Sequence, residues 1–225
     1  MDSLFDIFDS VILFDTETTG VNPGQDEIIE IALLRAVKKN GVPVIEDESD
    51  LFIKLSHNKK LPAIITDLTG ITEKKLLEEG VSKEAACAEL VRMLDHRDSL
   101  LVAYNAQFDL CFLYYFLDNY GKAALLRNFK MLDVLTIYKD RKPYPHKLSD
   151  AVSMYSIPQQ NAHLAIDDVR ATYELLTAMG KEEDDLQHYV NLFGYNPKYG
   201  VSGRRISSVK YLPQKYDAIK KLYEF

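Results

Sequence analysis

The stretch VILFDTETTG, residues 11–20, decides both the fold and the chemistry expected of this chain. Its four leading apolar residues are typical of a buried strand, and a polar turn that contains Gly20 follows them. Alternate side chains of an extended chain share a face, so Asp15 and Glu17 point the same way. Two such carboxylates repel each other unless a cation lies between them. A hard divalent ion with oxygen ligands, such as Mg²⁺, fits that requirement.

Apolar patterns along the rest of the chain predict an α/β fold. We expect strands at residues 11–14, 28–37, 50–55, 100–104 and 131–137, and helices at 73–79, after 82, at 110–117, 148–155 and 166–179. The last helix is expected to stop at Gly180. Strands first, then strands interleaved with helices, predict a mixed sheet flanked by helices.

Charge and loop content divide the chain near Gly180. We expect one domain over residues 1–180 and a basic, loop-rich C-terminal extension over residues 181–225. Residues 198–225 carry a net charge of +5, which leaves −12 for the remainder of a chain whose total is −7. Such a tail fits contact with phosphates, but from charge alone simple solvation is the favoured interpretation. The acidic run 181–185 is interpreted as a solvated helix start.

Bulk features exclude several classes of protein. No apolar run approaches the roughly 20 residues that span a bilayer, so membrane insertion is not expected. Acidic residues in the sequence MDSLFD at the N-terminus argue against a secretory signal, which predicts a cytoplasmic location. Cys87 and Cys111, the only cysteines, lie in apolar helical patterns and indicate core thiols rather than a disulfide framework or zinc site.

Further acids stand where strands or loops pass into helices. Asp109 opens the helix near residue 110, and Asp167 and Asp168 open the helix of residues 166–179. Each acid could simply cap its helix, because the N-terminal N–H groups favour negative charge. Consecutive helical residues are about 100° apart, so only one of the last two acids can face a shared site. His163 precedes this helix, and an exposed loop position is its simplest interpretation.

Taken together, these residues resemble the three motifs of the DEDDh exonucleases, a family that includes the proofreading epsilon subunit of bacterial DNA polymerase III and RNase T. The motifs are Asp15-x-Glu17, Asn105-Ala106-x-Phe108-Asp109 and His163-x-x-x-x-Asp168. The resemblance covers residues 10–180 and implies a ribonuclease H-like fold. Where many relatives have His, this chain has Tyr104. Leu164 stands where a tyrosine subset has its Tyr, so the histidine version applies and selects Asp168.

The resemblance also implies a chemistry. It predicts a 3'-5' exonuclease that releases nucleoside 5'-monophosphates with two divalent cations, Mg²⁺ or Mn²⁺, and with His163 as general base. The implied metal ligands are Asp15, Glu17, Asp109 and Asp168. The resemblance also implies that the substrate is contacted by Thr16, Thr18, Leu68, Asn105 and Phe108. Single-stranded DNA 3' ends are the favoured substrate, RNA 3' ends are the alternative, and a DNA polymerase is a possible partner.

Other interpretations of the 11–20 stretch fit less well. Asp15, Glu17, Thr19, Gly20 and Asp26 fall at positions of a calcium-loop template, but that loop needs a helix where the apolar strand is predicted. An aspartic protease needs Asp-Thr-Gly, and this chain has Glu at position 17. A non-catalytic metal- or nucleic-acid-binding module on the same fold stays open as the second class of function.

Overall fold

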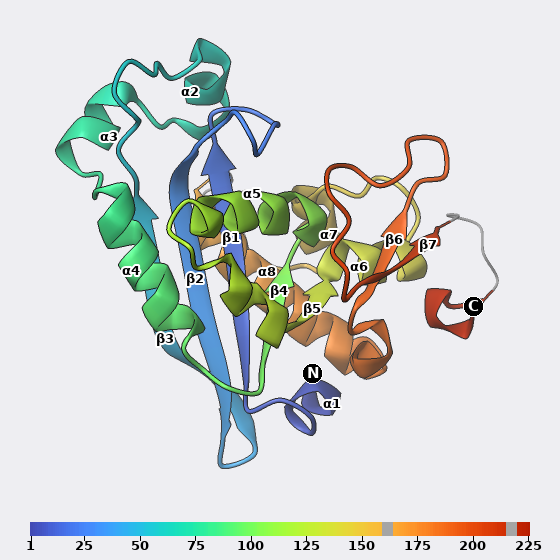
Figure 1. Cartoon of the computed structure of the whole chain (residues 1–225). Coiled ribbons are helices and arrows are strands. Elements are labelled where there is room, and N and C mark those ends of the chain that lie inside the picture. Colours follow the sequence, from blue (N-terminus) through green and yellow to red (C-terminus); the bar gives the residue numbers. More distant parts are fainter. Residues whose placement is uncertain (159–163, 215–219) are drawn as a thin grey trace.

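A computed structural model describes residues 1–158, 164–214 and 220–225 of the chain (Figure 1). Its elements, in chain order, are α1 (Asp2–Phe5), β1 (Ser10–Thr18), β2 (Ile28–Lys39), β3 (Val42–Phe52), α2 (Ala63–Thr69), α3 (Glu73–Glu78), α4 (Lys83–Leu94), β4 (Ser99–Ala103), α5 (Ala106–Asp118), η1 (Ala123–Asn128), β5 (Lys130–Asp133), α6 (Val134–Arg141), α7 (Leu148–Met154), α8 (Ala165–Glu182), η2 (Leu186–Tyr189), β6 (Leu192–Tyr195), β7 (Lys210–Pro213) and η3 (Leu222–Glu224). Among the described helices, none is long and apolar enough to cross a membrane.

The main sheet has five strands in the order β3-β2-β1-β4-β5, with β1 at its centre. β1 pairs antiparallel with β2 and parallel with β4, so the sheet is mixed as predicted. A two-stranded parallel sheet of β6 and β7 is separate from it. The α/β, ribonuclease H-like fold class is therefore confirmed.

Side chains that alternate along β1 build two hydrophobic cores, one on each face of the sheet. Val11 and Leu13 join the core beneath α8, whereas Ile12 and Phe14 join the core beneath α4 and α5. Figure 1 shows α8 behind the sheet and α4 and α5 in front of it. Because the alternation continues, Asp15 and Glu17 follow Val11 and Leu13 on the face that α8 covers.

The strand predicted over residues 131–137 ends early, at Asp133. The Asp133 carboxylate accepts hydrogen bonds from the Leu135 amide (3.2 Å) and the Thr136 hydroxyl (2.7 Å), and it caps α6. It also accepts from the amides of Asn105 (2.9 Å) and Ala106 (3.1 Å), where β4 turns into α5. The apolar run was correctly seen, but the prediction of strand beyond Asp133 was wrong because the capping residue was overlooked.

Two other predicted boundaries were also wrong. β3 begins at Val42, eight residues before the expected start, and it is joined to β2 by an Asn40-Gly41 turn with φ of 52° and 80°. α8 continues through Gly180 to Glu182. A Cβ at Gly180 would lie 2.0 Å from the Met1 backbone nitrogen, so this glycine permits close packing of the N-terminal segment and does not end the helix.

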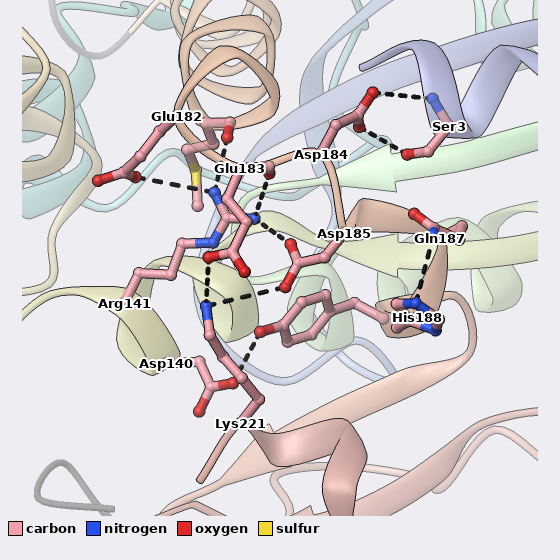
Figure 2. A network of polar contacts seen from close by, with 12 residues as sticks. Ser3, Asp140, Arg141, Glu182, Glu183, Asp184, Asp185, Gln187, His188 and Lys221 are labelled. Atoms are coloured by element: carbon pink, nitrogen blue, oxygen red, sulfur yellow. Dashed lines mark hydrogen bonds and ion pairs between the residues drawn. The ribbon is translucent and has the colours of Figure 1, made fainter. Parts of the chain in front are cut away.

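The prediction that the acidic run 181–185 is a solvated helix start was wrong. These residues instead form ion pairs and hydrogen bonds with other segments (Figure 2). The Arg141 side chain, only 4% exposed, pairs with Asp185 and donates to the Met179 carbonyl near the end of α8 (2.7 Å). Asp184 accepts from the amide (2.9 Å) and hydroxyl of Ser3. These contacts bind the start of the extension to α6, α8 and the N-terminal segment.

We predict that Asp133→Ala lowers the free energy of unfolding by about 3–5 kcal/mol, because four donors lose a buried acceptor and charge-assisted hydrogen bonds are worth about 1.5–3 kcal/mol each without being additive. Urea denaturation followed by circular dichroism measures the change. Asp118→Ala, an exposed position at the end of α5, is the matched control and should stay within about 0.5 kcal/mol of wild type. Equal stability of the two variants would contradict the role of Asp133.

Candidate metal site

Three of the predicted carboxylates meet at one end of the central strand. Asp15 and Glu17 come from β1, and Asp168 comes from the first turn of α8, which crosses the same face. One oxygen from each of the three can be chosen so that all lie within 4.8 Å of one another. The arrangement follows from the alternation of β1 and from the packing of α8 against it.

Asp109 approaches from the other side of β1. It lies in the first turn of α5, is 3% exposed, and accepts from both the amide (3.0 Å) and the hydroxyl (2.7 Å) of Thr16. Thr16 stands between Asp15 and Glu17 in the chain, so these two bonds hold Asp109 next to the cluster. The structure thus places the fourth predicted acid beside the other three, anchored through the strand.

Asp167 and Asp168 point in different directions, as helical geometry requires. Asp168 joins the acidic cluster, whereas Asp167 lies 3.8 Å from the Arg170 guanidinium, which also binds Glu48 of β3. The choice of Asp168 over its neighbour made from the motif agrees with this arrangement.

Burial and mutual repulsion raise the carboxyl pKa values of the cluster. The pKa of Glu17 rises to about 8, first because of burial and then because of the charges on Asp168 and Asp109. Burial also raises the pKa of Asp15 well above its usual range, with Asp109, Asp168 and Glu17 adding to the effect. The pKa of Asp109 rises to about 7 through burial, against the opposing hydrogen bonds from Thr16. Each charge is therefore costly in the absence of a cation.

A fifth carboxylate, which the sequence did not single out as functional, lies behind the cluster. Glu30 stands opposite Glu17 in the register of β1 and β2 and is fully buried. Burial is the main reason that its pKa rises to about 8, with the charge of Asp50 adding to it. The cross-strand position could have been found by extending the alternation of β1 across the hairpin to β2.

The residues present suit a hard divalent cation. The donors are all carboxylate oxygens, the ligand type that Mg²⁺ and Mn²⁺ prefer. Within the described residues, no lysine or arginine forms an ion pair with Asp15 or Glu17. A cation bound among the three oxygens would offset the charges of these carboxylates.

The remaining predicted residues have varied positions. His163 lies outside the described residues. Thr16 and Thr18 are buried, and the Thr18 hydroxyl donates to the Gly20 carbonyl (2.6 Å). Asn105 is exposed with φ of 67°, and Phe108 is half-buried with its ring 4.9 Å from that of Phe112. Leu68 is 55% exposed on α2.

The fold and the acidic cluster define a ribonuclease H-like nuclease class, and comparison with known proteins agrees. A family model for exonucleases, RNase_T, matches residues 12–176. The chain therefore belongs to this exonuclease family, and the predicted DEDD resemblance is confirmed.

Similar proteins include DNA polymerases and exonuclease I. The DNA polymerase III PolC-type of Bacillus subtilis (strain 168) is 32% identical over 194 residues, which cover 82% of this chain and 12% of that protein. The PolC-type enzyme of Clostridium perfringens is 31% identical over 228 residues, 96% of this chain and 14% of that protein. This chain thus spans a small part of these relatives' length. E. coli exonuclease I in complex with a dA16 oligonucleotide shares the fold, with a TM-score of 0.71, 19% identity, and coverage of 80% of this chain and 42% of that one.

The raised pKa values predict how stability depends on pH. Because the pKa of Glu17 moves from 4.5 to about 8, the metal-free folded protein binds more protons than the unfolded chain within that window. Its free energy of unfolding should fall as pH rises from about 5 to about 8. We expect the Tm difference between Glu17→Gln and wild type, measured with a chelator, to grow in favour of the variant over this range.

Thermal unfolding with and without metal completes this test. Mg²⁺ or Mn²⁺ should raise the Tm of wild type at about pH 8, because ligands that bind the folded state stabilise it, and should raise that of Glu17→Gln less. Asp167→Asn removes a neighbouring charge outside the cluster and should follow wild type. A Tm difference for Glu17→Gln that shrinks as pH rises would contradict the electrostatic assignment.

Proposed function

We propose that this protein is a divalent-metal-dependent 3'-5' exonuclease that hydrolyses nucleic-acid 3' ends to nucleoside 5'-monophosphates. The observation that carries the proposal is the meeting of Asp15, Glu17 and Asp168 within 4.8 Å on one face of β1, with Asp109 anchored beside them. Membership of the exonuclease family supports the same reaction.

The proposed chemistry divides roles among the chain's own residues. Asp15, Glu17 and Asp168 would hold the cations, and Asp109 would complete the set from α5. Two divalent cations held by these residues would supply charge that lowers the pKa of an attacking water and offsets charge on the departing 3' oxygen. His163 would accept the proton from the attacking water, since an imidazole with an ordinary pKa of about 6.5 is largely neutral at pH 7 and can take up a proton.

Substrate positioning is proposed for residues around the cluster. The end of β1, from Thr16 to Thr18, would approach the terminal nucleotide through its backbone and the Thr18 side chain, and Asn105 would contact the phosphate or sugar. Phe108 and Leu68 would lie near the base, and the exposed position of Leu68 on α2 leaves it accessible for such a contact. Thr16 supports the site by holding Asp109.

Single-stranded DNA is the favoured substrate in this proposal. Support comes from the E. coli exonuclease I complexes with oligonucleotides and from the DNA polymerases among the relatives. These substrates are those of the similar proteins. An RNA 3' end could be hydrolysed by the same set of carboxylates and is the alternative substrate. A polymerase partner and a cytoplasmic location belong to the same proposal. Digestion of matched 5'-labelled single-stranded DNA, duplex DNA and RNA with Mg²⁺ and Mn²⁺ separates these substrates and fixes the polarity.

Removal of one charged ligand should abolish the reaction. We predict that Asp15→Asn and Asp168→Asn each reduce nucleotide release by at least about 10³-fold, which corresponds to about 4 kcal/mol of barrier, while the fold is retained. Release of nucleotides from a 5'-labelled oligonucleotide measures the rate. Asp167→Asn makes the same chemical change one residue away and should retain activity within about threefold. Activity of Asp15→Asn within about tenfold of wild type would make the metal assignment wrong.

The role of His163 can be separated from that of the acids by its titration. Activity of the wild type should rise with pH across the histidine range, since only the neutral imidazole accepts a proton. We predict that His163→Ala keeps metal and DNA binding, loses about 10² to 10⁴ in rate, and loses that inflection. The pH profile of nucleotide release at saturating metal measures both effects. A near-normal rate with an unchanged profile would return His163 to an ordinary loop residue.

A further inference from the structure

The C-terminal extension and α5 enclose a cavity of about 300 Å³. Leu110, Cys111, Tyr114 and Tyr115 line it from the helix. Because successive helical residues are about 100° apart, these four lie on the side of α5 that faces away from Asp109. The cavity is therefore a second hollow, separate from the acidic cluster.

The floor of the cavity is apolar and one wall is aromatic. Leu126 and Met131 are buried beneath it, together with Leu110. The Tyr114 and Tyr115 rings meet edge to face, with centroids 5.5 Å apart at 89°, and Tyr115 is partly exposed. Such a surface suits a flat aromatic group rather than a fully hydrated one.

Three arginines surround this apolar floor. Arg127 comes from η1, and Arg204 and Arg205 come from the loop between β6 and β7. No acidic residue lines the cavity, and in the described part of the chain none of the three arginines forms an ion pair. The Arg204 guanidinium lies 5.1 Å from the Tyr114 ring centroid. In a chain of net charge −7, this is a local concentration of uncompensated positive charge.

Buried contacts fix the loop that carries two of these arginines. The Gln107 side chain, 8% exposed in the first turn of α5, donates to the carbonyls of Ser202 (2.9 Å) and Arg204 (2.8 Å) and accepts from the Tyr211 hydroxyl (2.6 Å). Gly203 has φ of 70°, and a Cβ there would lie 3.2 Å from the Cys111 sulfur. These contacts hold the loop between β6 and β7 closely against α5.

We propose that this cavity binds a nucleotide unit, with the base against the tyrosines and apolar floor and the phosphate among the three arginines. Planar guanidinium groups match phosphate oxygens in pairs, and aromatic side chains stack on any base. Ser207 and Ser208 add hydroxyl donors at the rim. The volume is at the lower end of the roughly 300–1,000 Å³ of small-molecule sites, which suits one nucleotide. The nucleotide is either one unit of a bound strand or a free mononucleotide, since both present the same base and phosphate to the cavity.

Binding without catalysis tests the proposal. Fluorescence anisotropy of a labelled oligothymidylate, in a chelator that prevents cleavage, gives the affinity and its salt dependence, and thymidine 5'-monophosphate as competitor probes the free nucleotide. R204Q/R205Q should weaken binding of at least one probe by about tenfold or more, the value of one lost charge-assisted contact. For the strand, the slope of log affinity against log salt should fall by about 0.7, since the cavity holds one phosphate and each single-strand phosphate contact contributes about 0.7.

Matched controls keep the result interpretable. K198Q/K210Q removes the same charge from the same extension but outside the cavity lining, and should change either affinity by less than about twofold. Arg127→Gln, on a different element, gives a second variant that leaves the loop intact and should weaken binding about threefold or more. Circular dichroism confirms that each variant is folded.

The two probes distinguish the source of the nucleotide. Loss of oligonucleotide binding alone assigns the cavity to a strand, loss of the mononucleotide alone assigns it to a free nucleotide, and either supports the proposal. Unchanged affinities for both probes in R204Q/R205Q and in Arg127→Gln would overturn it. So would variants that lose binding of a labelled acidic peptide while they keep both nucleotide affinities. None of these readouts depends on hydrolysis, so failure of the proposed exonuclease activity would be seen separately.

Discussion

The buried carboxylate of Asp133 joins the three segments on which the acidic site depends. It accepts hydrogen bonds from two backbone amides at the start of α5 and so fixes where that helix begins. The first turn of α5 then carries Asp109 to Thr16, and Thr16 lies between Asp15 and Glu17 on β1. The Thr136 hydroxyl donates a hydrogen bond to the same carboxylate and accepts one from the Gly194 amide of β6. The extension is therefore attached to this junction too.

Within this frame the chain gathers carboxylates that oppose its own folding. Burial and mutual repulsion raise the pKa values of Asp15 and Glu17, so each ionised group lowers stability until a cation arrives. Hydrophobic packing offsets that cost, because β1 is the middle strand and is covered on both faces. The acids sit where the apolar rows of β1 end, so the same periodicity serves first packing and then chemistry.

Simple periodicity predicted the features that depend on one element at a time. Alternation placed Asp15 and Glu17 together, and the helical angle separated Asp168 from Asp167. Features that depend on several segments were missed. β3 is an outer strand whose residues 42–48 are exposed or half-buried and include Pro43 and three acids, so no buried pattern marks its start, although the Asn40-Gly41 pair is a strong hairpin signal. Gly180 reads as a helix end in isolation, and only the packed N-terminal segment shows why it is glycine.

The last turn of α8 lies beyond the region that matches the exonuclease family, which ends at residue 176. Met179, Leu186, Tyr189 and Leu222 beyond that limit are buried in the same core as Leu13 of β1. A fragment that ends at residue 176 would lack the Met179 and Glu183 carbonyls that accept hydrogen bonds from Arg141. It would also expose that core to water. For recombinant work the unit of expression is therefore set by the packing of the core, which includes residues well beyond the family limit.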